Sequence, residues 1–493
     1  MNPLIYEINT RVWIRQFDTP SERATLDDVP EQVWIDLKKN GFDAVWLMGV
    51  WKTSKDLIEK CCFESGLVQS YDKALGDWKK EDVIGSPYSI EAYRVSPDLG
   101  TTAELRWLKG IMNQHGLSLI LDFIPNHFGA STPLLKEMPE AFLQVSRETF
   151  ESDPYSFFES PFQSGVYFAH GRDPFFAAWT DTVQINYFSP LARELMLQQM
   201  MLISDWCDGI RCDMAMLTLN NVFHNTWASA IDTEQYPKPE QEFWKTAIQS
   251  VKNEYPEFLF IAEAYWNLEW SMQQLGFDYT YDKKLYDRLR YNHANYIRDH
   301  LNADAEYRRK LVRFIENHDE ERAVTVFGQE KAFAAVTLIG TIEGMRMFQD
   351  GQCQGRRIKL PVQLGREPKE NANPYIKEQY SKLFSIIKAD IFKFGEWTLL
   401  DTHPVGEKES SHNDIIVYVW TYGYDTEHRL VAVNYSDGTA QCRVKYEYEG
   451  SAINEITLTD LLTGAEYTRT VMELQDPGLF ISLGPYQSHI FKF

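Results

Sequence analysis

Short apolar runs alternate with amphipathic stretches along most of this chain, and this alternation constrains the fold more than any other feature of the sequence. Eight runs have the length and composition of buried strands. They are residues 5–9, 44–48, 118–124, 209–213, 258–263, 277–281, 312–316 and 345–348. Helical patterns lie between them, for example at residues 29–40, 102–114, 189–205 and 243–254. This alternation predicts a (β/α)8 TIM barrel, a fold of the α/β class.

The alternation is interrupted after the third predicted strand and ends before the C-terminus. Residues 128–186 are rich in Pro, Phe, Ser and Asp, and a segment this long without a clear period is usually functional or a small subdomain. The residues after 395 contain short alternating strands, predicted at residues 415–420, 429–434, 442–448 and 480–482, which are separated by turn signals. We therefore predict three parts: a catalytic barrel of residues 1–127 and 187–395, an inserted subdomain of residues 128–186 that lines the cleft, and a C-terminal all-β sandwich domain of residues 396–493.

Charge and composition exclude several classes of partner. The chain has 71 Asp and Glu against 49 Lys and Arg, and this balance disfavours nucleic acid and anionic membranes as partners. It contains no uninterrupted apolar stretch of about 18 residues. The N-terminus does not read as a secretory signal, although a processed precursor would look the same. The six cysteines form no Cys-x-x-Cys pair, so we expect reduced thiols and a cytoplasmic location.

Four segments place polar side chains directly at the ends of predicted strands. They are Asp122-Phe123-Ile124-Pro125-Asn126-His127, Gly209-Ile210-Arg211-Cys212-Asp213, Ile261-Ala262-Glu263-Ala264 and Glu316-Asn317-His318-Asp319. The active sites of such barrels lie at the C-terminal ends of the strands. A retaining glycosidase needs two carboxyl groups about 5–5.5 Å apart, one as nucleophile and one as proton donor. Asp213 and Glu263, at the ends of successive strands, can supply that pair.

The residues around Asp213 and Glu263 suit these roles. A nucleophilic carboxylate must be ionised, and Arg211 lies on the same strand face as Asp213, where it would lower the pKa of that carboxyl. Glu263 follows an apolar run whose burial would raise the pKa of a proton donor. Taken alone, an Arg-x-Asp is more often a structural ion pair and a strand-end Glu is more often a cap. The four segments together favour catalysis.

Two histidines follow strand ends in the same way. Asn317, His318 and Asp319 are three consecutive polar residues, which are costly to bury for stability alone. Asp319 would bind sugar hydroxyls and, as a like charge, raise the pKa of Glu263, while His127 and His318 would donate hydrogen bonds to the sugar. A lone His-Asp pair is more often a salt-bridged loop. A metal site is the weaker interpretation, because no His-x-x-x-His or Cys cluster accompanies the histidines.

In this order, the four segments resemble the four signature regions of the alpha-amylase family, glycoside hydrolase family 13, and the resemblance covers nearly the whole chain. It implies that Asp213 is the nucleophile, that Glu263 is the acid and then the base, and that Asp319 is the third carboxylate. It also implies that Arg211 orients Asp213, and that His127 and His318 bind the sugar before the scissile bond.

Two further segments are similar to the family pattern. Residues 85–93, with Pro97 and Gly100-Thr101, resemble the second-strand segment, in which Tyr88 would stack under the same sugar. Residues 184–187 stand where the family has a short motif near the end of the inserted domain.

The chain departs from the family immediately after the nucleophile. Many secreted members carry Lys-His three and four residues after it, and that His ligates calcium through its carbonyl oxygen. Met216 and Leu217 occupy those positions here, so we expect no metal cofactor, neither calcium nor any other, and a structural role for Asn126. Met214 does not match the Val typical of α-1,6-specific members.

Three functions follow from this pattern. The first is a retaining hydrolase of α-glucosidic bonds in malto-oligosaccharides or related α-glucans, with the oligosaccharide as its partner. The second is a transglycosylase with the same residues, in which a sugar instead of water accepts the glycosyl group. The third is an inactive accessory or binding protein on the same fold, as in amino-acid transporter heavy chains. We rank it low because all three carboxylates are present and the membrane anchor of those proteins is absent. The sequence carries no signal for linkage, chain length or oligomeric state.

Overall fold

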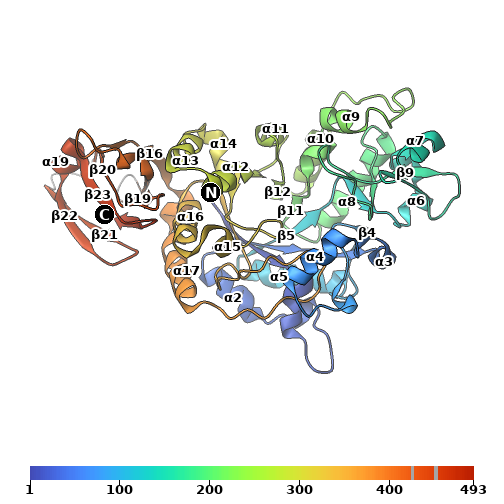
Figure 1. The fold of residues 1–493 in the computed structure, drawn as a ribbon, viewed down its shortest axis with the longest axis horizontal. Coiled ribbons are helices and arrows are strands. Elements are labelled where there is room, and N and C mark those ends of the chain that lie inside the picture. The colour runs from blue at the N-terminus through green and yellow to red at the C-terminus, as the bar shows by residue number, and fades with distance from the viewer. Residues whose placement is uncertain (424–426, 449–453) are drawn as a thin grey trace.

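A closed barrel of parallel strands forms the centre of the molecule (Figure 1). The computed structural model describes residues 1–423, 427–448 and 454–493. The barrel strands follow one another around the barrel in chain order, and the last pairs with the first. They are β1 (Leu4–Asn9), β2 (Ala44–Met48), β5 (Ser118–Phe123), β11 (Gly209–Cys212), β12 (Leu259–Ala262), β13 (Tyr279–Tyr281), β14 (Leu311–Arg313) and β15 (Met345–Gln349). Each overlaps one predicted run, so the predicted barrel is confirmed.

Helices surround the barrel on its outer side. Four of them match the amphipathic stretches: α2 (Glu31–Lys39), α5 (Thr102–Gln114), α8 (Pro190–Ser204) and α10 (Phe243–Glu254). The others are α1 (Thr10–Trp13), α9 (Asn220–Trp227), α11 (Glu269–Gln274), α12 (Lys283–Tyr291), α13 (Ala294–Leu301), α14 (Ala305–Arg309), α15 (Ala323–Phe327), α16 (Gln329–Thr341), α17 (Pro374–Ile387) and α18 (Asp390–Phe394). Thr101 caps α5 through its hydroxyl and forms a capping box with Glu104.

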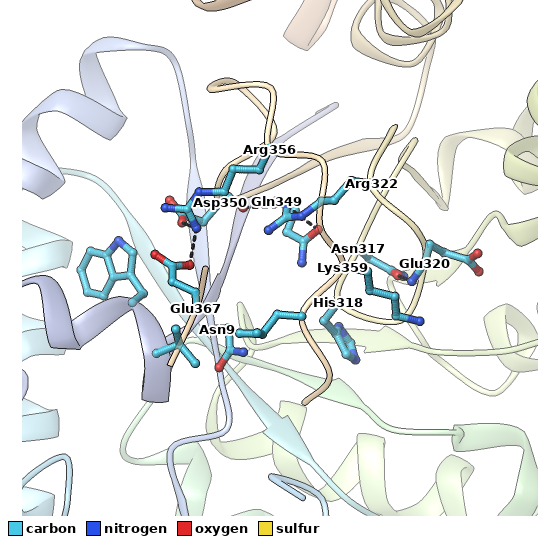
Figure 2. Close-up of a pocket in the computed structure, with 13 residues that line it drawn as sticks. Asn9, Asn317, His318, Glu320, Arg322, Gln349, Asp350, Arg356, Lys359 and Glu367 are labelled. Atoms are coloured by element: carbon cyan, nitrogen blue, oxygen red, sulfur yellow. Dashed lines mark hydrogen bonds and ion pairs between the residues drawn. The ribbon is translucent and has the colours of Figure 1, made fainter. Parts of the chain in front are cut away.

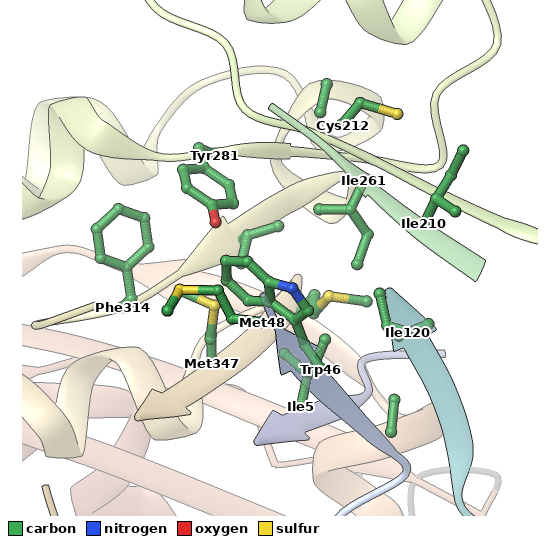
Figure 3. Close-up of a cluster of buried hydrophobic side chains, with 14 of the residues drawn as sticks. Ile5, Trp46, Met48, Ile120, Ile210, Cys212, Ile261, Tyr281, Phe314 and Met347 are labelled. Carbon is green, nitrogen blue, oxygen red and sulfur yellow. The ribbon is translucent and has the colours of Figure 1, made fainter. Parts of the chain in front are cut away.

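Large side chains from the strands fill the interior of the barrel (Figure 3). Trp46, Met48, Ile261 and Met347 are all buried there, and Tyr281 lies among them. The interior is therefore a packed core, which holds the strand ends, and the polar residues that follow them, in fixed positions.

Two excursions from the barrel lie beside these strand ends. The first contains β3 (Trp51–Thr53), α3 (Ile58–Cys61), α4 (Ser65–Ala74) and β4 (Ile90–Val95). The second is the inserted subdomain, at the right of Figure 1, in which β6 (His127–Gly129) pairs with β10 (Thr182–Gln184). Between these two strands lie α6 (Leu134–Glu137), β7 (Gln144–Val145), α7 (Arg147–Ser152), β8 (Phe157–Glu159) and β9 (Tyr167–Ala169).

The C-terminal domain is antiparallel, which confirms the predicted all-β domain. One sheet has the order β16-β18-β19-β24-β21-β22 and the other β17-β20-β23. The strands are β16 (Glu396–Leu400), β17 (Thr402–His403), β18 (Ile415–Tyr422), β19 (Glu427–Asn434), β20 (Ala440–Val444), β21 (Glu455–Asp460), β22 (Glu466–Thr470), β23 (Leu479–Leu483) and β24 (Ser488–Lys492), with a short helix α19 (Val471–Glu473). The sequence predicted only β18, β19, β20 and β23.

Two further observations concern membrane-spanning helices and the cysteines. Among the residues described, no helix has both the length and the apolar character that crossing a membrane requires. All six cysteines are free thiols.

Candidate active site

One buried arginine joins the carboxylates at the ends of three neighbouring strands. Arg211, on β11, donates from Nη1 to Asp213 Oδ1 at 2.8 Å and from Nη2 to Glu263 Oε2 at 2.7 Å. Asp122, at the end of β5, lies 3.7 Å from the same Nη1. The two strand-end carboxylates that the sequence singles out are therefore held within the span of one guanidinium group.

Aromatic rings enclose this arginine. The guanidinium carbon lies 5.0 Å from the centre of the Trp46 ring and 5.5 Å from those of Tyr88 and Tyr281. Burial opposes the charge of Arg211, but the carboxylates, Glu263 first among them, outweigh it and raise the pKa above its ordinary value. Arg211 is therefore a permanent cation within hydrogen-bond reach of both carboxylates.

Main-chain hydrogen bonds place the two carboxylates at the rim of the barrel. The Asp213 N–H donates to the Phe123 carbonyl at 2.8 Å, and the Glu263 N–H donates to the Cys212 carbonyl at 3.0 Å. The parallel ladder thus continues one residue beyond β11 and β12. Met214 then adopts a left-handed conformation (φ 42°), which turns the chain away directly after Asp213.

Asp213 does not have the low pKa that the sequence predicted. Burial raises its pKa to about 7, Arg211 opposes this effect, and Glu263 adds to it. Burial likewise raises the pKa of Asp122 to about 6, against the effect of Arg211. One cation does not offset three carboxylates in a dry site, so the prediction of a net lowering by Arg211 is wrong for the free site.

Glu263 is buried, but donors rather than apolar groups surround its carboxylate. Oε2 accepts from Arg211 and from the Met214 N–H at 2.7 Å, and Oε1 accepts from the Tyr265 hydroxyl at 2.6 Å. The apolar run before Glu263 predicted apolar surroundings for its carboxylate. The apolar residues lie along β12, which ends at Ala262, and not at the carboxylate itself.

His318 lies at the centre of a second group of contacts. Its Nδ1 is 2.6 Å from Glu7 Oε1, and its Nε2 is 2.7 Å from the Tyr88 hydroxyl and 3.1 Å from Asp319 Oδ2. Burial alone would lower the pKa of His318, but Asp319 and Glu7 raise it to about 10, so the ring is an imidazolium. Burial would raise the pKa of Asp319, yet His318 brings it below its ordinary value. The Asp319 side chain is 51% exposed, which places this carboxylate at the open side of the site.

His127 differs from His318 in both position and charge. It lies on β6, where its ring hydrogen-bonds to the main chain of Tyr88 and packs 5.3 Å from the ring of Trp179. Burial lowers its pKa to about 3, so the imidazole is neutral. The structure thus brings six predicted residues into one connected group and joins His127 to it only through Tyr88. The six are Tyr88, Arg211, Asp213, Glu263, His318 and Asp319.

Sequence reasoning missed several residues of this site. Glu7, within the buried strand β1, holds His318, and a charged residue inside an apolar run was the available signal. Tyr281 accepts a hydrogen bond from Arg211 Nε at 3.2 Å, and Tyr265 donates to Glu263. These two tyrosines carried no signal, since their spacing is that of ordinary core residues.

A small polar pocket adjoins His318 (Figure 2). Its volume is about 30 Å³, which leaves room for water and not for a sugar ring. Arg356 pairs with Glu367 and lies 3.6 Å from Asp350, while the Lys359 ammonium group contacts the main-chain carbonyl of Asp319. These contacts tie the loop after β15 to the side of the site formed by His318 and Asp319.

The residues around Asn126 do not fit a calcium ion. The Gln184 amide donates at 3.0 Å to the Asn126 main-chain carbonyl, to Asn126 Oδ1 and to the Ile185 carbonyl, so these oxygens already have a donor. Within the described ranges, no three His, Cys, Asp or Glu side chains are grouped to hold a metal.

Exposed aromatic rings lie close to the Glu263 side of the site. Trp266, three residues after Glu263, packs its ring 5.0 Å from that of Phe175 in the inserted subdomain. Both rings are exposed. Trp266 and Asn267 both adopt left-handed conformations (φ 61° and 66°), which are rare for residues other than glycine and cluster at functional sites.

Comparison with known proteins agrees with this geometry. The family model described as the alpha-amylase catalytic domain matches residues 34–379. The alpha-amylase MalA of Haloarcula japonica is 22% identical over 367 residues, which cover 72% of this chain and 44% of that protein. The chain therefore spans less than half the length of this relative.

Solved structures share the fold. A maltogenic alpha-amylase, AmyB of Thermotoga neapolitana, superposes with a TM-score of 0.69 at 19% identity, over 100% of this chain and 98% of that one. An alpha-amylase of Geobacillus thermoleovorans, solved in complex with acarbose, superposes with a TM-score of 0.65 at 17% identity, over 99% and 98%.

Proposed function

Because the chain belongs to the alpha-amylase family, we propose that it hydrolyses α-glucosidic bonds of malto-oligosaccharides or related α-glucans with retention of the anomeric configuration. The observation that carries the proposal is the contact of Asp213 and Glu263 with the same guanidinium group. Two carboxyl groups this close leave no space for a water between them and the sugar, which favours retention over inversion.

In the first step, Asp213 attacks the anomeric carbon while Glu263 gives a proton to the leaving oxygen. A glycosyl–Asp213 ester forms and the glycosidic bond breaks. Glu263 Oε2 accepts from two N–H groups that can only donate, whereas Oε1 contacts the Tyr265 hydroxyl, which can also accept a hydrogen bond. Oε1 is therefore the oxygen that carries the proton. In the second step, Glu263 removes a proton from water, and this water displaces Asp213.

The charges around the carboxyl groups support these roles. The attack requires an ionised Asp213, although burial favours its protonated form. Arg211 Nη1 stabilises that negative charge directly. The exposed Asp319 carboxylate can bind sugar hydroxyls, and the charged His318, whose two ring nitrogens are engaged by protein groups, holds this carboxylate in place. The Tyr88 ring lies between Arg211 and His318, where it can support one face of the sugar.

Transglycosylation is the second candidate, and the Phe175–Trp266 pair favours it. The leaving sugar must lie near Glu263, which protonates it, and Trp266 is close to Glu263 in the chain. Exposed rings here offer a surface to a sugar acceptor, which would compete with water for the glycosyl–Asp213 ester.

Incubation with pure maltopentaose, followed by chromatography of the products over time, tests both functions. Shorter sugars alone indicate hydrolysis, whereas longer sugars in addition indicate transfer. Early products with the α configuration by NMR support retention, and β products contradict it. D213N is the control, and its full activity would exclude Asp213 as the nucleophile. No cleavage by the wild type would leave the binding-protein alternative.

A further inference from the structure

A second pocket lies on the outer wall of the barrel, at the helices that follow β12 and β13. It has a volume of about 550 Å³ and is lined by residues of α11, α12, α14 and the adjoining loops. Figure 1 shows these helices along the upper edge, apart from the inserted subdomain. The lining residues are Asn267, Glu269, Trp270, Lys284, Asp304, Glu306 and Tyr307. None of them belongs to the group of residues around Arg211.

Glu269 is the most unusual residue of this pocket. It is only 3% exposed, and within the described part of the chain its carboxylate has no hydrogen bond and no ion pair. Its oxygens are not among the fully enclosed polar atoms of the described residues that lack a partner, so they reach the water of the pocket. Lys284, which lines the same pocket, also has no ion pair among the described residues. An unpaired acceptor and an unpaired donor therefore face one cavity.

Two aromatic rings complete the pocket. Trp270 is 42% exposed, and its ring centre lies 6.3 Å from that of Tyr307, with the two planes inclined by 63°. The rings thus offer two apolar surfaces that meet at an angle. Such surfaces accept the C–H faces of sugar rings, while the carboxylate and the ammonium group can bind hydroxyls.

Charge argues against other ligands. The lining has three carboxylates and one ammonium group, which disfavours a phosphate or a nucleotide. The volume falls within the range of about 300–1,000 Å³ typical of small-molecule sites, which suits a short oligosaccharide.

We propose that this pocket binds a segment of an α-glucan outside the catalytic site, an inference that rests on the proposed function. Trp270 and Tyr307 support the sugar rings, and Glu269 and Lys284 bind their hydroxyls. The loop that begins at Glu263 continues through Trp266 to Asn267, which lines the pocket. This loop therefore connects the catalytic site to the pocket. A long chain held here remains close to the catalytic site.

Affinity electrophoresis in gels that contain soluble starch tests the proposal. All variants carry D213N to prevent cleavage, so the contribution of the catalytic site is the same in each. We expect W270A and E269Q to weaken the retardation by starch about threefold to tenfold, the loss expected for one aromatic or polar contact. W107A is the matched control, because Trp107 is 48% exposed on α5 and lines none of the pockets described.

Retardation of W270A and E269Q equal to that of W107A would overturn the inference. Thermal unfolding of each variant identifies any loss that comes from misfolding, and in that case W270L, which fills more of the space than Ala but has no ring, replaces W270A. Wild-type cleavage of maltopentaose tests the proposed function separately. If maltopentaose is not cleaved, saturation-transfer NMR with maltoheptaose on the D213N background still tests the pocket. A signal weaker in W270L than in W107A supports the inference, and equal signals refute it.

Discussion

Two buried glutamates lie on either side of one short loop, and their surroundings are opposite. Glu263 accepts hydrogen bonds from a guanidinium group, a main-chain N–H and a tyrosine hydroxyl. Glu269, six residues later, accepts no hydrogen bond among the residues described, although its charge acts on His300 and Tyr307. A carboxylate whose partners are all protein groups is held in position for chemistry on a substrate. One without such hydrogen bonds is left to bind water or a ligand that enters the pocket.

The largest difference should appear in activity. We expect E263Q to lower kcat/KM for maltopentaose by about 10²–10⁴-fold, because an amide cannot transfer the proton. E257Q, an exposed glutamate just before β12, should retain wild-type activity. Activity of E263Q within tenfold of wild type would assign the proton transfer to another group. Azide, a small nucleophile, should restore turnover of an activated aryl maltoside by E263Q.

Removal of Arg211 should have the largest effect on stability. R211M leaves Asp122, Asp213 and Glu263 without their shared cation, and a broken buried ion pair costs about 3–5 kcal/mol. R211K keeps the charge but cannot bridge two carboxylates, so it should recover stability more than activity. Denaturant unfolding and kcat/KM measure the two effects. Equal recovery of both by R211K would show that charge alone matters.

The pH dependence should reflect the burial of Asp213. Because its pKa in the free site is about 7 and attack needs the ionised form, kcat/KM should fall as pH decreases below about 7. A flat profile between pH 5 and 8 would contradict the assignment.

The same group should also make stability depend on pH. The folded state binds a proton at Asp213 that the unfolded state, with a pKa of 3.8, has released. The folded state therefore loses stability as pH rises from about 4 to 7. D213N lacks this term, so its melting temperature relative to wild type should increase across that window. A constant difference would show that Asp213 titrates normally.

His318 should show a smaller, spectroscopic effect. Asp319 and Glu7 raise its pKa to about 10, so its ring should not titrate between pH 5 and 8 in histidine-labelled NMR spectra. E7Q removes one of the two charges and should bring the titration of His318 toward neutral pH. E320Q is the control, because it removes a nearby charge that does not contact His318, and it should leave the titration unchanged. H318Q assigns the signal. A wild-type midpoint near 6.5 would contradict an imidazolium.

Most of the barrel followed from the sequence because its strands are continuous apolar runs, buried on both faces. In the C-terminal domain, β21 was missed because it alternates exposed with buried or half-buried residues, and β22 because it alternates exposed and half-buried ones, so neither contains a long apolar run. Asp213, Glu263 and Asp319 could be predicted because they stand at strand ends. The partners that were missed had weaker signals: Glu7 is a charge inside an apolar run, and Tyr281 carried none. Their roles depend on closure of β1 and β13 into one barrel around Arg211.

The pKa of Asp213 was mispredicted for a related reason. Arg211 is visible two residues away in the sequence, but the degree of burial and the number of carboxylates that share one cation are properties of the packed site. Spacing along a strand predicts which groups meet. It does not predict which of the opposing effects on a pKa prevails.

The smallest expected effect concerns the stability of the two glutamate variants. E263Q places an amide N–H₂ among three donors and should lose about 1–3 kcal/mol. E269Q has no hydrogen bond to lose and should change the free energy of unfolding by less than about 1 kcal/mol. Maltoheptaose should give a further difference. It should raise the melting temperature of D213N more than that of the D213N/E269Q double variant, because a ligand stabilises only the state that binds it. A large loss of stability in E269Q would mean that Glu269 serves the fold, and an equal shift with maltoheptaose would mean that it binds no sugar.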